Sequence, residues 1–246
     1  IEFSKGQYIG FIDGDDWIDT EMYETLYNDL KKYDADVSDV NSIITSVEFS
    51  YINDTGVITV YEGMEILKDY FISDKCSCCR KLYKRTVISD IRFPVGKINE
   101  DIATNFLFLK NAGRIVKNSK KMYYYFKNPM STTGEMFRKR DFDLIDACAN
   151  LVSYASYDKE LHQLATVKKA MSYYSLLGRY ICYEQESSFF DVDDRAKDLK
   201  INLLENRKLI MKSHVSMKKK FLISILCVFD PVFLKKVYNI YRRIEK

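Results

Sequence analysis

Apolar residues follow two different spacings along this chain, and the change comes near residue 137. Before it, short apolar runs of strand type alternate with polar turns and brief helical stripes. The run from Tyr8 to Ile12 has apolar residues on both parities, which predicts a strand covered on both faces of its sheet. Met22, Leu26 and Leu30 recur every four residues, which predicts a helix with one buried stripe.

Other patterns complete the list of predicted elements. Residues 35–60 are rich in strand-forming residues, and the segment from Asn53 to Gly56 is typical of a hairpin turn between two strands. Glu100 and Asp101 begin a helix that Gly113 terminates. The remaining predictions are a helix over 62–72, strands over 114–116 and 122–126, and helices over 139–157, 159–186, 191–212 and 217–244.

Strands that alternate with helices, followed by helices alone, predict an α/β domain with a helical C-terminal subdomain. We expect residues 1–135 to form the α/β part, 136–216 the helical subdomain, and 217–246 a basic amphipathic tail helix. No apolar run reaches the roughly 18 residues of a membrane-spanning helix.

The net charge of +3 is unevenly distributed. Residues 207–246 contain eleven Lys and Arg residues and two acidic residues, whereas residues 1–206 contain 27 basic and 33 acidic residues. The basic tail indicates an anionic membrane surface as a partner, and it lacks the pattern of a nucleic-acid binder, so no nucleic-acid partner is expected. The apolar run 221–229 suits a helix lying in the membrane interface, and a core helix is the alternative.

Six cysteines are present, and three of them lie close together at Cys76, Cys78 and Cys79. Zinc usually takes two spaced pairs of Cys or His ligands, and the two histidines, His162 and His214, are distant in the sequence. Reduced thiols in a cytosolic protein are the simpler interpretation. We therefore expect a cytoplasmic protein, peripheral at the inner face of the cell membrane where the tail binds lipid.

Three carboxylates, Asp13, Asp15 and Asp16, directly follow the first predicted strand. They repel one another, and a divalent cation is the simplest compensating charge. Ligands of open α/β sheets bind at the carboxyl ends of strands, where this cluster lies. A calcium loop of EF-hand type is excluded, because Trp17 and Ile18 occupy positions that need a ligand and a glycine. A phosphatase of the haloacid dehalogenase type normally has a small residue at the position of Trp17, so the bulky tryptophan disfavours that interpretation.

The remaining interpretation of the acidic cluster is a nucleotide-sugar transferase. There the carboxylates hold Mn²⁺ or Mg²⁺, which bridges the donor diphosphate and neutralises charge on the leaving nucleoside diphosphate. A separate carboxylate takes the proton of the attacking acceptor hydroxyl. The pair Glu100 and Asp101 is the candidate for this base, and the alternative is that a helix N-terminus favours acidic residues for electrostatic reasons alone.

A family resemblance supports the last interpretation. The segment from Gly6 to Ile18, which reads GQYIGFIDGDDWI, resembles the central motif of inverting family 2 glycosyltransferases of the GT-A fold. Further segments resemble later parts of the same family in the same order, and together they cover about residues 4–135. These segments are 81–85, 91–94, 96–101, 123–125, 128–129 and 131–132.

The resemblance implies a role for each acidic residue. Asp13 and Asp15 match the family residues that contact the donor ribose and the diphosphate-bound metal, Mn²⁺ or Mg²⁺, with Asp15 as the main ligand. Asp101 matches the catalytic base, and Glu100 lies beside it. Asp16 matches a residue that lines the donor-sugar or acceptor side.

Two positions depart from the family pattern. Where the family often has an arginine that reaches the diphosphate, this chain has Phe126, and Lys127 is the nearest substitute, although a lysine lacks the bidentate fork of arginine. Cys79 and Arg80 stand where Trp-Asn is common, at the wall of the acceptor site.

The activity implied by the resemblance is transfer of a sugar from a nucleoside diphosphate-sugar donor to a hydroxyl of a glycan or lipid-linked acceptor. The transfer inverts the anomeric centre, and its expected setting is surface polysaccharide biosynthesis. Because family members carry a further strand and loop upstream that hold the nucleotide base, we expect the chain to be incomplete at its N-terminus. The alternative from a different class is a non-catalytic remnant whose tail binds a membrane or a partner protein.

Overall fold

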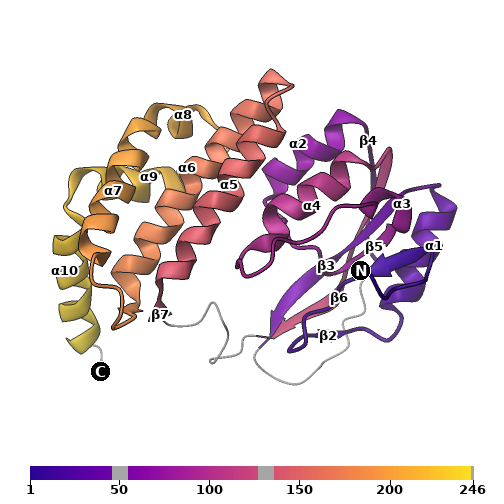
Figure 1. Cartoon of the computed structure of the whole chain (residues 1–246), viewed down its shortest axis with the longest axis horizontal. Helices are drawn as coiled ribbons and strands as arrows, with labels where there is room; N and C mark the ends of the chain where they lie inside the picture. Colours follow the sequence, from indigo (N-terminus) through magenta and orange to yellow (C-terminus); the bar gives the residue numbers. More distant parts are fainter. Residues whose placement is uncertain (46–54, 127–135, 245–246) are drawn as a thin grey trace. The chain divides into compact units, whose positions relative to one another are not determined.

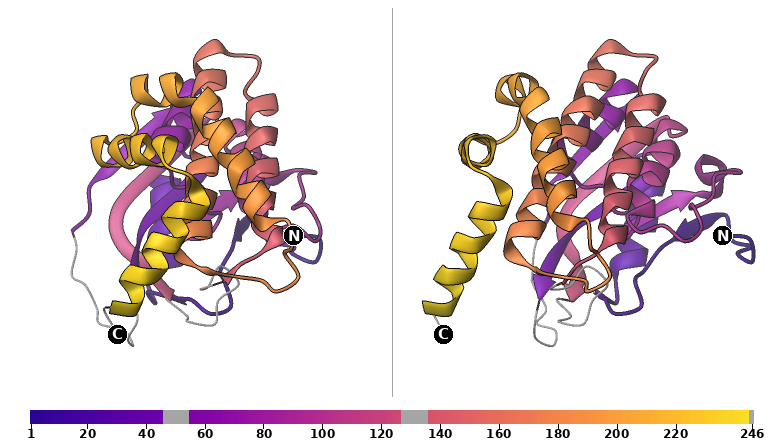
Figure 2. Two further views of the ribbon diagram at one scale, coloured as in Figure 1. Left: turned by 90° about the vertical axis from the view of Figure 1, so that its left-hand side faces the viewer. Right: turned by 60° about the vertical axis from the view of Figure 1, so that its left-hand side comes forward.

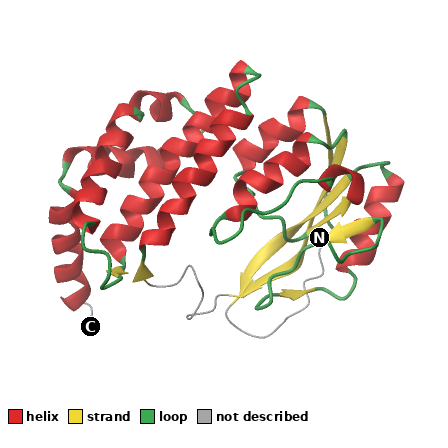
Figure 3. Cartoon of the chain, in the orientation of Figure 1, coloured by secondary structure: helices red, strands yellow, loops and turns green. Residues whose placement is uncertain are grey.

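A computed structural model describes residues 1–45, 55–126 and 136–244 of the 246-residue chain. The chain divides into two compact units. Unit 1 comprises residues 1–95 and 100–134, and unit 2 comprises residues 96–99 and 135–246. Each unit is described by itself below. Figure 1 gives the element labels and Figure 3 colours the helices and strands.

Unit 1 is built on one mixed sheet with the strand order β1-β5-β3-β6-β2, and β4 also pairs with β6. The pair β3 and β6 runs parallel, and the other pairs run antiparallel. The strands are β1 (Tyr8–Gly10), β2 (Trp17–Ile18), β3 (Val37–Thr45), β4 (Ile58–Glu62), β5 (Lys81–Lys84) and β6 (Arg114–Phe126).

Helices cover both faces of this sheet, with α1 on one side and α2 and α4 on the other (Figure 1). The predicted stripe of α1 is confirmed, because Met22, Leu26 and Leu30 are buried against residues of β3 and β6. Each such side chain contributes about 1.5–3 kcal/mol by leaving water. The helices of unit 1 are α1 (Met22–Lys32), α2 (Met64–Ser73), α3 (Arg85–Ile88) and α4 (Glu100–Lys110).

The predicted hairpin within 35–60 is not tested, because residues 46–54, which include most of its turn and the run before it, lie outside the described part. In the part that is described, β3 and β4 do not pair with each other, because β6 lies between them. The 13-residue β6 also replaces the two short strands that were predicted. The pairing of β3 with β6 shifts in register between Asp39 and Ser42 of β3. This shift lets β6 continue as one strand through its polar residues 117–121.

The predicted strand at Tyr8–Ile12 is shorter and less covered than expected. It ends at Gly10, and Ile12 is exposed. The chain leaves the sheet at Phe11, whose ring packs edge-on against Tyr83 and Phe93. β1 has β5 as its partner among the described strands, so one long side of it has no strand to cover it there.

Unit 2 is almost wholly helical (Figure 3). The predicted helices are found, although the last two are each divided, and the last divides at Asp230 and Pro231 as the proline requires. A short parallel pair, β7 (Met136–Phe137) and β8 (Glu184–Gln185), was not predicted. The helical elements are η1 (Lys139–Phe142), α5 (Asp143–Tyr154), α6 (Lys159–Cys182), α7 (Val192–Glu205), α8 (Arg207–Lys212), α9 (Met217–Val228) and α10 (Pro231–Ile244).

The core of unit 2 consists of apolar side chains from α6, α7, α8 and α9, together with Phe137 and Phe189. Phe137, Leu177 and Tyr180 lie at its centre, and Ile223 and Cys227 bring α9 into it. None of the helices in the described residues combines the length and the apolar character that crossing a membrane requires.

Candidate active site

The acidic loop of residues 13–16 connects β1 to β2 in unit 1. A turn closes it, in which the backbone N–H of Asp16 donates to the carbonyl of Asp13 (3.2 Å). The side chains of Asp13 and Asp15 are exposed, whereas Asp16 is half-buried. The loop therefore presents two carboxylates to solvent and turns the third inward.

The Asp16 carboxylate is held by β6 through both of its oxygens. The hydroxyl of Tyr123 donates to Asp16 Oδ2 (2.6 Å), and the backbone N–H of Phe126 donates to Asp16 Oδ1 (2.9 Å). The same hydroxyl accepts a hydrogen bond from the backbone N–H of Asp13 (3.2 Å). Tyr123 is fully buried, so the loop is fastened to a rigid strand at both ends of its turn.

The strand that holds the loop is itself fixed by pairing. Trp17 and Ile18 of β2 pair with Tyr124 and Tyr123 of β6. Burial raises the pKa of Asp16; the hydrogen bonds from Tyr123 and Phe126 act against this, while the charges of Asp13 and Asp15 add to it. The crowding of carboxylates that the sequence indicates is therefore present in the structure.

The second acidic pair opens α4 as predicted. Glu100 and Asp101 are the first two residues of this helix, where its dipole favours negative charge. Partial burial raises the pKa of Asp101 to about 6, with further upward contributions from Glu100 and Asp13 and a downward one from Lys81. Because Asp13 acts on Asp101 in this way, the two acidic motifs face the same region of unit 1.

Tyr125 of β6 marks the same region. Burial raises the pKa of its hydroxyl, and the charges of Asp16, Asp13, Asp15 and Asp101 raise it further. Four of the five candidate carboxylates therefore act on one half-exposed tyrosine, which lies two residues after Tyr123.

Cys79, which the family resemblance places at the wall of the acceptor site, contributes a thiol to this region. Side-chain hydrogen bonds link it to Tyr123 and Asp13, and burial raises the pKa of the thiol to about 11. The six cysteines are free thiols, and Cys76, Cys78 and Cys79 are all buried.

The basic segment 79–85 is not a surface patch, because its first two cations are buried. Arg80 and Lys81 are 5% and 2% exposed. Arg80 donates to Asp39 Oδ2 (3.3 Å) and to the carbonyl of Val40 (3.0 Å). Lys81 donates to the carbonyl of Ser77 (2.5 Å), and its Nζ lies 3.9 Å from Asp39 Oδ1.

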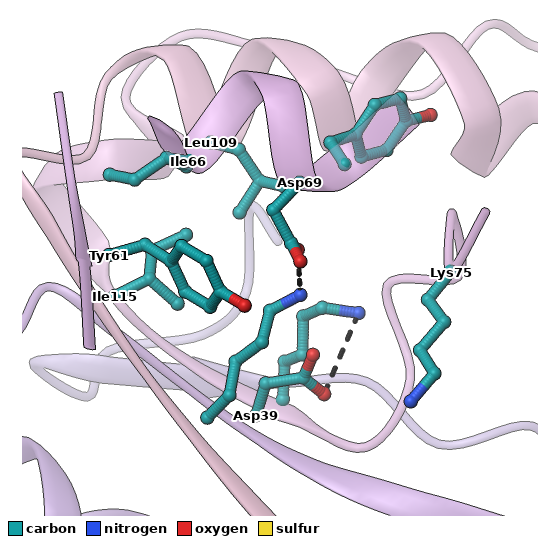
Figure 4. A pocket seen from close by; sticks show the side chains of 10 residues that line it. Asp39, Tyr61, Ile66, Asp69, Lys75, Leu109 and Ile115 are labelled. Carbon is teal, nitrogen blue, oxygen red and sulfur yellow. Dashed lines mark hydrogen bonds and ion pairs between the residues drawn. The ribbon is translucent and has the colours of Figure 1, made fainter. Parts of the chain in front are cut away.

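These cations form part of a buried charge cluster under the sheet (Figure 4). Asp39 faces a pocket that Tyr61, Asp69 and Lys75 also line, and a second ion pair joins Lys117 to Asp69. Burial lowers the pKa of Lys81 to about 8, and Asp39 acts against that shift. Because Lys81 also acts on Asp101, this cluster contributes positive potential to the candidate base.

Lys127, the predicted diphosphate contact, lies outside the described residues, as do the resembling segments 128–129 and 131–132. Tyr123 and Lys81 are the site residues to which the sequence assigned no role. For Tyr123 a signal existed, since the aromatic run 123–125 was part of the family resemblance, but the partner of its hydroxyl could not be inferred.

The donor set of the loop fits a hard divalent cation. Mg²⁺ and similar ions are commonly held by one or two carboxylates together with substrate phosphates, and Asp13 and Asp15 offer two exposed carboxylates. In the described part of the chain, no three Asp, Glu, His or Cys side chains converge as a complete metal site. A cation held here would therefore need further oxygen ligands from phosphate or water.

Comparison with known proteins relates the first part of the chain to a family of glycosyltransferases. Residues 1–92 match the family model described as "Glycosyl transferase family 2". The chain is 26% identical over 172 residues to glycosyltransferase GlyA of Streptococcus pneumoniae serotype 4, which covers 64% of this chain and 25% of GlyA. The N-terminal part of the chain is therefore similar to glycosyl transferase family 2.

The chain is also similar to a second curated glycosyltransferase. The chain is 28% identical over 146 residues to the uncharacterized glycosyltransferase YibD of Escherichia coli K12, which covers 54% of this chain and 42% of YibD. The chain thus spans less than half the length of both relatives.

Solved structures show the fold of the chain. S. aureus TarS (residues 1–349) in complex with UDP-GlcNAc matches with a TM-score of 0.54 at 16% identity, covering 98% of this chain and 69% of that structure. The complex of the same TarS fragment with UDP matches with a TM-score of 0.53. The chain therefore has the GT-A fold, with a helical C-terminal part.

Proposed function

We propose that the protein transfers a sugar from a nucleoside diphosphate-sugar to an acceptor hydroxyl with inversion at the anomeric carbon. The observation that carries this proposal is the placement of Asp101: a half-buried carboxylate with a raised pKa, close enough to the exposed acidic loop for Asp13 to raise that pKa further. A direct displacement needs a base for the acceptor hydroxyl, here Asp101. It also needs carboxylates on the side of the donor diphosphate, here those of the acidic loop, close to that base.

In this mechanism Asp101 accepts the proton of the acceptor hydroxyl as its oxygen bonds to the anomeric carbon. The bond from that carbon to the donor diphosphate breaks, and its electron pair leaves with the nucleoside diphosphate. Attack from the face opposite the leaving group inverts the centre in one step, so one base suffices. The raised pKa of Asp101 suits proton acceptance near neutral pH.

Asp15 and Asp13 would hold Mn²⁺ or Mg²⁺, with Asp15 as the main ligand. When bound, such a cation supplies positive charge that stabilises the leaving diphosphate. Asp16 has its two oxygens occupied by Tyr123 and Phe126, so we assign it the task of positioning the loop. Glu100 adds negative charge beside the base, and Lys127 remains the proposed cation for the diphosphate.

The donor and the setting follow by similarity. The TarS structures contain UDP and UDP-GlcNAc, which supports a nucleoside diphosphate-sugar donor for this GT-A fold. We propose a glycan or lipid-linked acceptor, and a role in surface polysaccharide biosynthesis at the cytoplasmic face of the cell membrane.

Release of nucleoside diphosphate from a panel of nucleotide sugars, beginning with UDP-GlcNAc, tests this function. We expect release that requires Mn²⁺ or Mg²⁺, stops on addition of EDTA, and resumes when excess cation is restored. Analysis of the product by NMR should show the anomeric configuration opposite to that of the donor. Absence of turnover with every nucleotide sugar, or product with retained configuration, would reject the proposal.

Tyr123→Phe tests the positioning of the acidic loop. The substitution keeps the buried ring but removes the hydroxyl that joins Asp16 to the backbone of Asp13. Loss of a group that orients metal ligands typically weakens metal affinity by about 10–100-fold, and we expect a loss of this size in Mn²⁺ affinity, measured by calorimetry. Tyr27→Phe, which removes a hydroxyl from an exposed tyrosine of α1, is the control and should leave it unchanged. Unaltered Mn²⁺ affinity in Tyr123→Phe would show that the hydroxyl is not needed.

A further inference from the structure

The C-terminal helix α10 carries an exposed apolar stripe. Phe233, Val237, Ile240 and Tyr241 recur at the spacing of one helical face, and each is between 47% and 60% exposed. Phe229, which precedes the helix, stacks on Phe233 with ring centroids 6.3 Å apart and is also exposed. An apolar face of this length is unusual on the surface of a protein with no partner.

The other face of α10 is attached to unit 2. Pro231 is buried, and the ammonium of Lys235 lies 4.7 Å from the ring centroid of Tyr180 on α6 and donates to Gln185. Figure 2 shows α10 running along the outer side of α6 and α7. The helix is therefore already held by its inner face, and the core of unit 2 leaves the stripe uncovered.

This arrangement changes the choice between an interfacial and a core helix in the tail. The apolar run 221–229 supplies Ile223 and Cys227 to the core of unit 2, so α9 is partly a core helix. Exposed apolar residues remain on both tail helices: Phe221 and Val228 on α9, and the stripe of four residues on α10.

Charge indicates which partner fits the stripe. Residues 207–246 carry eleven basic and two acidic residues. Lys236 and Arg242 are exposed on α10 itself, and Lys218 and Lys219 are exposed at the start of α9. A second copy of this chain that met the stripe through its own tail would bring the same positive charge to the contact and be repelled, whereas anionic lipid would compensate the charge.

We propose that α10 lies in the interface of an anionic phospholipid bilayer, with Phe233, Val237, Ile240 and Tyr241 inserted and Lys236 among the lipid headgroups. Helices with a large apolar face and basic flanks bind membranes in this orientation without spanning them. The proposal extends the proposed function, since a lipid-linked acceptor would be met at the same surface. Lipid binding is measured without turnover, so the membrane proposal and the proposed transferase function can fail separately.

Co-sedimentation of the protein with vesicles tests the proposal. The vesicles contain equal parts of phosphatidylglycerol and phosphatidylcholine, and vesicles of phosphatidylcholine alone provide the comparison. We expect binding to the anionic vesicles that weakens as salt is added. The double variant Phe233→Ser with Val237→Ser should bind about a hundredfold more weakly, at roughly tenfold for each apolar side chain removed from the bilayer.

A matched control uses two apolar residues of unit 2 outside the tail that are at least as exposed. Phe190→Ser with Ile201→Ser removes two such side chains and should leave vesicle binding unchanged. Because all four substituted residues are exposed, both variants should keep the wild-type melting temperature, which circular dichroism checks. Equal binding by the wild type and the Phe233/Val237 variant would overturn the proposal. So would absence of binding to anionic vesicles, or a stripe-dependent dimer in sedimentation velocity without lipid.

Discussion

Replacing Asp101 by Asn abolishes sugar transfer while nucleotide-sugar binding persists. The amide keeps the shape of the carboxylate but cannot accept the proton of the acceptor hydroxyl. A positioned general base contributes about 10²–10⁴-fold to rate, so we expect a loss of this size in kcat with little change in donor affinity. Nucleoside diphosphate release measures kcat, and calorimetry with donor and Mn²⁺ measures donor affinity.

Glu100→Gln is the matched control, because it alters the neighbouring acid of the same helix. The change removes one negative charge that raises the pKa of Asp101, and it leaves the proposed base in place. We expect its rate to remain within about tenfold of wild type. Turnover retained in Asp101→Asn would remove Asp101 from the mechanism, and a larger loss in Glu100→Gln than in Asp101→Asn would transfer the role to Glu100.

The pH dependence of the rate provides a second test of Asp101 as the base. A base acts in its ionised form, so kcat/KM should rise with pH through the pKa of Asp101, which lies at about 6. In Glu100→Gln the midpoint should move to lower pH, since Glu100 raises that pKa. Cation binding near Asp13 adds positive charge and shifts the midpoint in the same direction. A rate independent of pH between 5 and 8 would contradict the assignment.

Replacing Asp15 by Asn removes cation-dependent donor binding. With Asp13 and Asp15 as the two protein ligands proposed for the cation, loss of one charged oxygen leaves a single carboxylate. Loss of a group that only orients a metal ligand already weakens metal affinity by about 10–100-fold, so loss of a direct ligand should weaken it by about a hundredfold or more. Calorimetric titration with Mn²⁺, in the presence and absence of nucleotide sugar, measures the loss.

Asp90→Asn is the control for the change of charge. Asp90 is an exposed aspartate of unit 1 outside the acidic loop, so the substitution changes the net charge equally. We expect wild-type Mn²⁺ affinity in this variant, and wild-type melting temperatures in both, because Asp15 is also exposed. Donor binding by Asp15→Asn that still responds to Mn²⁺ as in the wild type would exclude Asp15 as the main ligand.

Parts of the candidate site were accessible from the sequence because they depend on short-range order. The acidic loop follows a strand, and Glu100 and Asp101 open a helix, as their positions in local patterns predicted. The assignment of catalytic and metal roles to these residues came from family resemblance and remains a prediction. What could not be predicted is the set of groups that act on them from distant parts of the chain.

Tyr123 and Lys81 illustrate this limit. The hydroxyl of Tyr123 meets a carboxylate 107 positions away in the sequence, and no local pattern specifies that partner. Lys81 belongs to a basic run that is typical of a surface. It is buried because Asp39, 42 positions earlier, arrives on the adjacent strand and compensates its charge.

The sequence alone determined the α/β class, the helical C-terminal part, the buried stripe of α1 and the acidic beginnings of loop and helix. Each of these depends on residues within a few positions of one another. The tertiary structure decided that β6 separates β3 from β4, that Arg80 and Lys81 are interior, and that α9 contributes Ile223 and Cys227 to a core while α10 keeps an uncovered apolar stripe. These outcomes depend on which distant segments compete for the same surface, and periodicity along the chain carries no information about that competition.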